Sequence, residues 1–272
     1  MKKRTKKKLA KYSKKAGIGL LKLVFVYPVK GAWYLIKKIR SKKESEGKKA
    51  VKGKVKNNAS FNKLKEIKNV KGNLAEFEKK ILTNKSTIGL ILGARGTGKS
   101  AIGMRLLENF KVKTKKNIYA MGFKIDSLPN WIKVVSNVQQ IKNDSVVLVD
   151  EGGIEFSSRK TMSNANTVLS ELMLIARHKD LGIIFITQNS ANLEINVIRQ
   201  ADYLLLKASS LLQKDFERTK IKKIYESVEE DFEKLKETLG ITYIYADVYR
   251  GFATNTLPSF WTDRVSKGYS GK

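Results

Sequence analysis

Cysteine is absent from this 272-residue sequence, and histidine occurs once, at position 178. The lack of cysteine excludes disulfides and thiolate-bound metals and is compatible with a reducing compartment. A single histidine argues against a metal site built on imidazoles. Acidic residues are also scarce, because 25 Asp and Glu stand against 55 Lys and Arg, which leaves a formal charge of +30. This excess of positive charge predicts a polyanionic partner.

The positive charge is concentrated at the N-terminus. Residues 1–58 contain 21 Lys or Arg and 2 Glu, a net +19 of the total +30. A dense block of like charge does not collapse on itself, so we expect an arm that binds nucleic acid or anionic lipid, with a merely solvated tail as the alternative. The sequence therefore divides into a basic N-terminal segment and linker, 1–58, and a folded domain, 61–272.

One apolar stretch, 16–36, interrupts the basic segment. Its length approaches the roughly 20 residues that cross a bilayer. Lys22, Pro28 and Lys30 lie within it, however, and a lysine inside the hydrocarbon is unfavourable. We therefore expect an interfacial or hairpin-like contact with an anionic membrane rather than a transmembrane span.

From Phe61 onward, short apolar runs alternate with helical stretches, which is typical of an α/β fold with a mainly parallel sheet flanked by helices. Strands are expected at 87–92, 117–122, 145–149, 182–187, 201–207 and 241–249. Helices are expected at 73–82, 99–109, 165–178 and 213–239.

The most specific motif is GARGTGKS at 93–100, which fits Gly-x-x-x-x-Gly-Lys-Ser and lies between an apolar strand and a helix. Glycines in such a loop let backbone N–H groups point inward at phosphates, together with the positive end of the following helix. Lys99 is expected to reach the β and γ phosphates of ATP, and Ser100 to ligate Mg²⁺. The predicted nucleotide-binding residues are Gly93, Ala94, Arg95, Gly96, Thr97, Gly98, Lys99, Ser100 and Ala101.

A second motif, VVLVDE at 146–151, is an apolar strand that ends in two acids. Asp150 is placed to hold the Mg²⁺ ion, and Glu151 to polarise the attacking water. Two adjacent acids at a strand end are often plain surface residues. An apolar strand about 50 residues after a P-loop favours the catalytic interpretation.

Two further residues complete the predicted site. Gln188 follows the strand 182–187 and is expected to sense the γ-phosphate at the carboxyl edge of the sheet. Charge on the transferred phosphoryl group is usually neutralised by an arginine supplied in cis or by a neighbouring subunit. Arg177 is the first choice for this finger, although it equally suits a helix C-terminus. The other candidates are Arg159, Arg199 and Arg218.

GARGTGKS, VVLVDE and ARHKDLGIIFITQN, in this order, resemble the HerA and FtsK superfamily of RecA-like P-loop ATPases. Its viral and mobile-element members, including genome-packaging ATPases and zonula occludens toxin-like proteins, are the most similar. The resemblance covers roughly 61–269. It implies that Asp150 and Glu151 bind metal and activate water, that Gln188 is a sensor, and that Arg177 acts across a subunit boundary. It also implies a homo-hexamer that pumps double-stranded DNA.

The leading hypothesis is therefore an ATP-hydrolysing DNA translocase that packages or moves a viral or mobile-element genome. The alternative is a membrane-attached virion-assembly or export ATPase of the zonula occludens toxin-like type. A nucleotide-dependent scaffold is the third, non-enzymatic reading, but Lys99, Asp150 and Glu151 are all present. The expected location is the host cytoplasm or the virion, with peripheral membrane attachment through residues 1–58 if the alternative holds.

Overall fold

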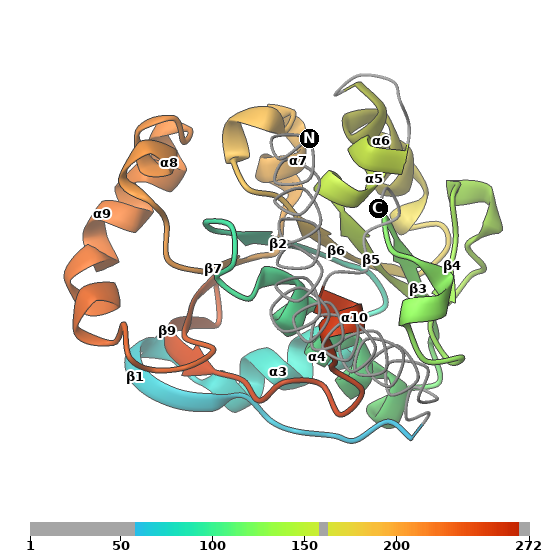
Figure 1. Cartoon of the computed structure of the whole chain (residues 1–272), viewed down its shortest axis with the longest axis horizontal. Coiled ribbons are helices and arrows are strands. Elements are labelled where there is room, and N and C mark those ends of the chain that lie inside the picture. The colour runs from blue at the N-terminus through green and yellow to red at the C-terminus, as the bar shows by residue number, and fades with distance from the viewer. Residues whose placement is uncertain (1–57, 158–162, 267–272) are drawn as a thin grey trace, which may run out of the picture. The chain divides into compact units, whose positions relative to one another are not determined.

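The structure is a computed structural model that describes residues 58–157 and 163–266 (Figure 1). These residues form one sheet with the strand order β1-β9-β8-β7-β2-β6-β5-β3-β4. The strands are β1 (Lys65–Gly72), β2 (Thr87–Leu92), β3 (Asn117–Met121), β4 (Lys133–Val134), β5 (Ser145–Asp150), β6 (Leu181–Ile186), β7 (Tyr203–Leu206), β8 (Thr242–Ala246) and β9 (Tyr249–Thr254). The predicted 16–36 stretch and the candidate Arg159 lie outside the described residues.

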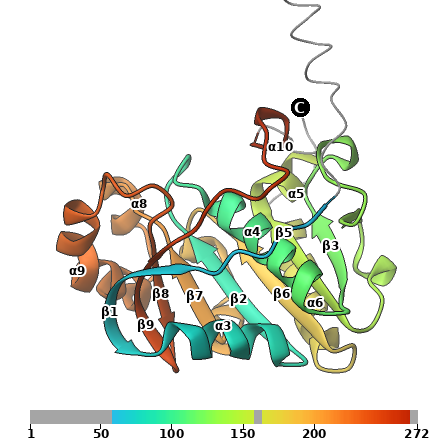
Figure 2. The same cartoon turned by 90° about the horizontal axis from the view of Figure 1, so that it is seen from below.

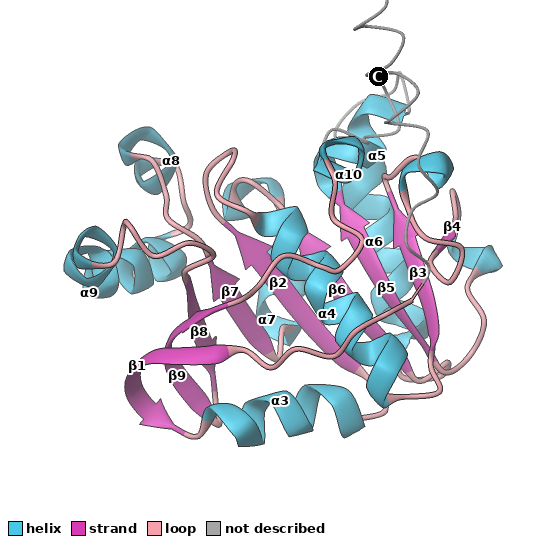
Figure 3. Cartoon of the chain, turned by 60° about the horizontal axis from the view of Figure 1, so that its bottom comes forward, coloured by secondary structure: helices cyan, strands magenta, loops and turns pink. Residues whose placement is uncertain are grey.

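The part of the sheet from β7 to β4 is parallel, whereas β8, β9 and β1 add antiparallel strands at one side (Figure 3). All six residues of β2, β5 and β6 are buried. Strands covered on both faces give continuous apolar runs, which is why the sequence predicted them with little error. The mainly parallel α/β sheet is thereby confirmed.

Successive residues of each strand point to opposite faces, and each face supports its own apolar core. The first core packs against α3 (Leu74–Thr83) and the P-loop helix α4 (Lys99–Lys113). The second packs against α6 (Ser163–Ala176), α7 (Ile195–Gln200) and α9 (Thr219–Lys234). Figure 2 shows α3 and α4 together on one face of the strands. The remaining helices are α5 (Glu151–Ser157), α8 (Leu211–Asp215) and α10 (Asp263–Ser266).

Two elements that were predicted as continuous are each divided into two in the structure. The helix expected at 213–239 is divided into α8 and α9, because Glu217 and Arg218 at the break bind the loop that follows β6. The strand expected at 241–249 is a hairpin, in which β8 and β9 turn at Asp247 and Val248. β1 was missed altogether, since it pairs with β9 through its backbone while nearly all its side chains are exposed.

A buried ion pair ties the beginning and the end of the described domain to the P-loop helix. Arg105 and Glu108 are 2% and 0% exposed, and the Arg105 Nη1 donates to Glu108 Oε2 at 2.5 Å. Glu108 also accepts from the Ser60 N–H at 2.9 Å and from the Ser259 N–H at 3.1 Å. Arg105 donates to the carbonyl of Thr256 at 3.2 Å. We call this group of contacts the α4 clasp.

A candidate nucleotide and metal site

The P-loop lies between the end of β2 and the start of α4, as the sequence predicted. Gly93, Gly96 and Gly98 have φ values of 146°, 82° and 89°, in the region that favours glycine. Gly93 is further required by packing, since a Cβ there would lie 2.5 Å from the Cβ of Lys207. Among the described residues, no side chain caps the N-terminus of α4, which begins directly after Gly98. A helix N-terminus of this kind is where proteins bind phosphate oxygens.

Lys99 lies folded over the P-loop. Its Nζ donates to the carbonyl oxygens of Gly93 at 2.7 Å and Ala94 at 2.9 Å. Burial lowers the pKa of Lys99, and the nearby charges of Asp150 and Glu151 oppose this shift. The amine is thus within electrostatic reach of both acids, and it is held by backbone acceptors that a phosphate can replace.

Asp150 is joined directly to the P-loop helix. The Ser100 hydroxyl donates to Asp150 Oδ2 at 3.3 Å, and the Gly153 N–H donates to Oδ1 at 3.3 Å. Burial raises the pKa of Asp150 to about 6, although these hydrogen bonds and the Lys99 charge act to lower it. A cation bound here would favour the ionised carboxylate. A hydroxyl and a carboxylate side by side form the hard oxygen donor set that Mg²⁺ prefers, so the two residues fit the ion.

Glu151 follows Asp150 as the first residue of α5 and is 7% exposed. It therefore lies at the carboxyl end of β5, the edge at which β2 leads into the P-loop. A carboxylate at this edge is in the position that a general base for the attacking water requires.

Gln188 lies at the same edge of the sheet. The N–H of Thr187 donates to the carbonyl of Ile91 at 3.0 Å, so the end of β6 is held beside the end of β2. The Gln188 side chain is exposed, and its backbone carbonyl accepts a hydrogen bond from the side-chain amide of Gln213. Its placement suits the predicted sensor, and it connects the site to α8.

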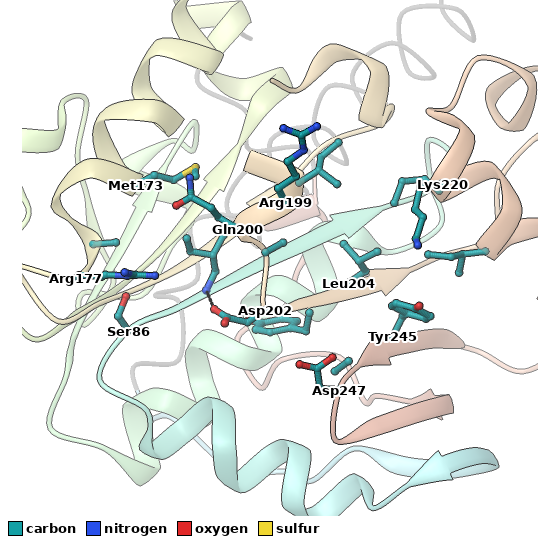
Figure 4. Close-up of a pocket in the computed structure, with 18 residues that line it drawn as sticks. Ser86, Met173, Arg177, Arg199, Gln200, Asp202, Leu204, Lys220, Tyr245 and Asp247 are labelled. Carbon is teal, nitrogen blue, oxygen red and sulfur yellow. Dashed lines mark hydrogen bonds between the residues drawn. The ribbon is translucent and has the colours of Figure 1, made fainter. Parts of the chain in front are cut away.

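Arg177 is not brought to the P-loop within one chain. It follows α6, whose end lies near the start of β5, where the Asp144 N–H donates to the Lys179 carbonyl at 2.8 Å. Figure 4 shows Arg177 close to Ser86, which precedes β2. A six-residue strand such as β2 is about 20 Å long, so this arginine and the P-loop lie at opposite ends of the sheet. A finger role for Arg177 within its own chain is excluded, and a role toward a neighbouring subunit stays a prediction.

The other arginine candidates are placed as follows. Arg199 is exposed and lines the same cavity as Arg177 (Figure 4). Arg218 holds the loop after β6, since its Nε donates to the Ser190 carbonyl at 3.0 Å and its Nη2 donates to the Leu193 carbonyl. Its contacts give it a structural role.

The cavity beside Arg177 has a volume of about 580 Å³. It lies at the amino ends of β2 and β7, between α6, α7 and α9. Its charged side chains, including Asp202, Lys220 and Asp247, are exposed (Figure 4). Asp202 accepts from the Ile88 N–H at 2.7 Å, which is a strand-end contact rather than a catalytic arrangement.

Sequence reasoning missed two features of the site. Lys207, taken as the last residue of a strand, lies directly behind the P-loop. Its only signal was a lysine immediately after an apolar strand. The α4 clasp was missed as well, because charged residues on a helix usually face solvent.

Together, the loop after β2, the buried acids after β5 and the parallel sheet define a P-loop NTPase. The chain belongs to the zonular occludens toxin (Zot) family, whose sequence profile matches residues 102–242, just over half of the chain. The P-loop motif immediately precedes the matched region. Comparison with curated proteins gives no significant match.

Several solved structures are similar to this chain. One is the genome packaging NTPase B204 from Sulfolobus turreted icosahedral virus 2 in complex with ATP-gammaS, with 18% identity, 64% of this chain and 100% of that chain covered, and a TM-score of 0.43. Another is the N-terminal domain of zonular occludens toxin from Neisseria meningitidis, with 14% identity, coverage of 68% and 98%, and a TM-score of 0.37. A third, EssC from Geobacillus thermodenitrificans, has 12% identity, coverage of 65% and 40%, and a TM-score of 0.41.

Proposed function

We propose that this protein is a Mg²⁺-dependent ATPase. The observation that carries the proposal is the 3.3 Å contact between Ser100 and Asp150, because it joins the phosphate-binding loop to the acid-bearing strand. In the proposed mechanism, Lys99 exchanges the carbonyls of Gly93 and Ala94 for the β and γ phosphates of ATP. The N–H groups of 96–101 bind the remaining phosphate oxygens.

Ser100 and Asp150 would hold the magnesium ion, which supplies charge neutralisation at the phosphates. Glu151 accepts a proton from the attacking water as the bond from the water oxygen to the γ-phosphorus forms and the bond to the β–γ bridging oxygen breaks, which releases ADP. Gln188 then reports the presence of the γ-phosphate. Its carbonyl is bound by Gln213, so a shift of this residue is passed to α8.

We further propose that the protein works as a homo-hexamer that moves double-stranded DNA. Two observations support this: the formal charge of +30, which suits phosphate backbones, and the position of Arg177 at the end of the sheet remote from its own P-loop. An arginine so placed acts on ATP only if a neighbouring subunit presents it, and a ring of subunits provides that contact. The similarity to a genome packaging NTPase is in keeping with this reading.

A second candidate is a membrane-attached ATPase for virion assembly or export. It is favoured by membership of the Zot family and by the basic, partly apolar segment at 1–58. Within the part of the chain that the structure describes, no helix is long and apolar enough to cross a bilayer. The site is the same in both proposals, and they differ in what ATP hydrolysis moves. Both place the protein in the cytoplasm or virion, the second at a membrane surface.

The test is an ATPase assay with and without duplex DNA across a salt series. The first proposal expects stimulation by DNA that declines steeply as salt rises, because bound Lys and Arg release counterions from phosphates. If no ATP were hydrolysed under any of these conditions, the proposal that the protein is an ATPase would be refuted. Hydrolysis that ignores DNA, combined with flotation on anionic vesicles that is lost when residues 1–58 are deleted, would favour the second proposal.

A further inference from the structure

Lys207 is a buried lysine on the back of the P-loop. It follows β7, and its backbone N–H donates to the carbonyl of Leu92 at 2.8 Å, at the point where β2 becomes the loop. Only 1% of its surface is exposed. A Cβ on Gly98 would lie 4.0 Å from the Lys207 Nζ, so the amine lies close to the backbone of the P-loop.

The amine is satisfied by backbone alone. Nζ donates to the carbonyl of Gly240 at 2.9 Å and to that of Ile241 at 3.1 Å, in the turn between α9 and β8. A neutral amine has two hydrogens, which matches these two acceptors. Within the described residues, no carboxylate forms an ion pair with Lys207, and burial alone lowers its pKa to about 7.

The charged groups on the surrounding elements are engaged elsewhere or, like Arg95 and Glu237, exposed to solvent. On the P-loop side, Lys99 is bound to the loop carbonyls. At the end of α9, Glu233 and Lys236 pair with each other at 2.5 Å. On β8, Tyr243 belongs to the apolar core on the face of α9. An anion that binds near Lys207 would therefore interact with an amine that has no counter-ion.

We infer that Lys207 is a second lysine of the nucleotide site, which takes up a proton when phosphates bind to the front of the P-loop and attracts them through the loop. The inference rests on the proposed function, since it requires nucleotide at the P-loop. Lys207 is a positioning residue: it supports the loop through Gly93 and supplies charge without touching the substrate. A nearby anion favours the charged form of a lysine, so phosphate binding and protonation reinforce each other.

The test measures proton uptake by titration calorimetry with Mg·ADP, which binds without turnover, at about pH 8 in two buffers of different ionisation enthalpy. At this pH a lysine with a pKa near 7 is mostly neutral in the free protein. The unmodified protein is expected to take up roughly half to one proton more per bound ADP than Lys207→Met, because protonation of the ligand itself is common to both. Lys207→Met should also bind ADP about tenfold more weakly.

Lys116→Met is the matched control. Lys116 is likewise a largely buried lysine that donates to two backbone carbonyls, those of Lys85 at 2.5 Å and Asp180 at 3.0 Å, but it lies at the opposite end of the sheet. Its loss should leave proton uptake and ADP affinity unchanged. If the two lysines mattered only for folding, both variants would be less stable than the unmodified protein, and neither would differ from it in proton uptake.

The outcomes separate the two proposals. If the folded protein does not bind Mg·ADP, the proposed function fails and this inference falls with it. If ADP binds and Lys207→Met matches the unmodified protein in affinity and proton uptake, the inference alone is refuted. Should Lys207→Met fail to fold, the unmodified protein decides: the number of protons taken up must rise between about pH 7 and 8, above the range in which Asp150, with a pKa of about 6, releases its proton, and an unchanging number overturns the inference.

Discussion

Charged side chains lie at both ends of the parallel strands, but their surroundings differ. At the carboxyl ends, Lys99, Asp150 and Lys207 are 9%, 5% and 1% exposed. At the amino ends, Arg177 and Asp202 are exposed in a wide cavity. Water screens exposed charges, whereas buried charges act strongly on one another and on a ligand. The burial of the charged side chains therefore distinguishes the carboxyl ends of the strands as the site.

The largest expected effect comes from Glu151→Gln, which removes the proposed base from the buried end. Turnover should fall by about 10²–10⁴-fold, while ATP affinity stays within about twofold. Lys99→Ala should show the opposite pattern, with weakened nucleotide binding. Single-turnover hydrolysis together with equilibrium binding measures both. Turnover by Glu151→Gln at the unmodified rate would show that the base assignment is wrong.

The comparison between buried and exposed charges can also be made for stability, at the α4 clasp. Glu108→Gln leaves Arg105 buried without its counter-ion, and we expect a loss of about 3–5 kcal/mol in the free energy of unfolding. Lys236–Glu233 is the matched exposed pair, since it also spans three residues at 2.5 Å, with side chains 60% and 71% exposed. Glu233→Gln should cost less than about 1 kcal/mol. Equal losses in denaturant titrations would remove burial as the deciding factor.

A variant of Arg177 tests whether the amino ends of the strands contribute to catalysis in a neighbouring subunit. Arg177→Ala should retain nucleotide binding in isolated subunits, because it lies far from its own P-loop. Mixed with an equal amount of unmodified protein, it should reduce ATPase activity several-fold below the average of the two, as a finger supplied to a neighbour requires. Activity equal to that average would assign Arg177 to its helix end alone.

The effect that is smallest per step, because it is spread over several pH units, is on the pH dependence of stability. In the unfolded chain the pKa of Lys207 is 10.5, and burial lowers it to about 7 in the fold. The unfolded state thus holds more protons between these pH values, so this residue makes stability rise with pH through that window and fall as pH drops toward 7. The slope due to Lys207 is at most about 1.4 kcal/mol per pH unit. Thermal unfolding of the unmodified protein and Lys207→Met from about pH 7 to 10 should differ by this slope, and parallel curves would contradict it.

The P-loop and its neighbouring strands could be predicted because their signals are local. Glycines at 93, 96 and 98 adopt positive φ angles that other residues avoid, and β2 and β5 are buried on both faces. Ser100 and Asp150 were each predicted as ligands of Mg²⁺, and they lie within hydrogen-bond distance of each other.

The features that sequence reasoning missed depend on distant contacts. The break between α8 and α9 exists because Glu217 binds Ser190, which is 27 residues away in the chain. β1 has no apolar pattern, since its partner is the backbone of β9. The remoteness of Arg177 depends on the direction in which α6 crosses the sheet. Lys207 was predicted only as the last residue of a strand. Its role depends on its contact with the P-loop, which the local sequence does not show.

Glu108 binds the backbone of residue 60 near one end of the described domain and that of residue 259 near the other. Fraying at either end must therefore disturb the same carboxylate. In hydrogen exchange, the amides of Ser60 and Ser259 should open together, and both should slow when a ligand rigidifies α4. The two ends of the domain would then behave as a single cooperative unit, although about 200 residues separate them.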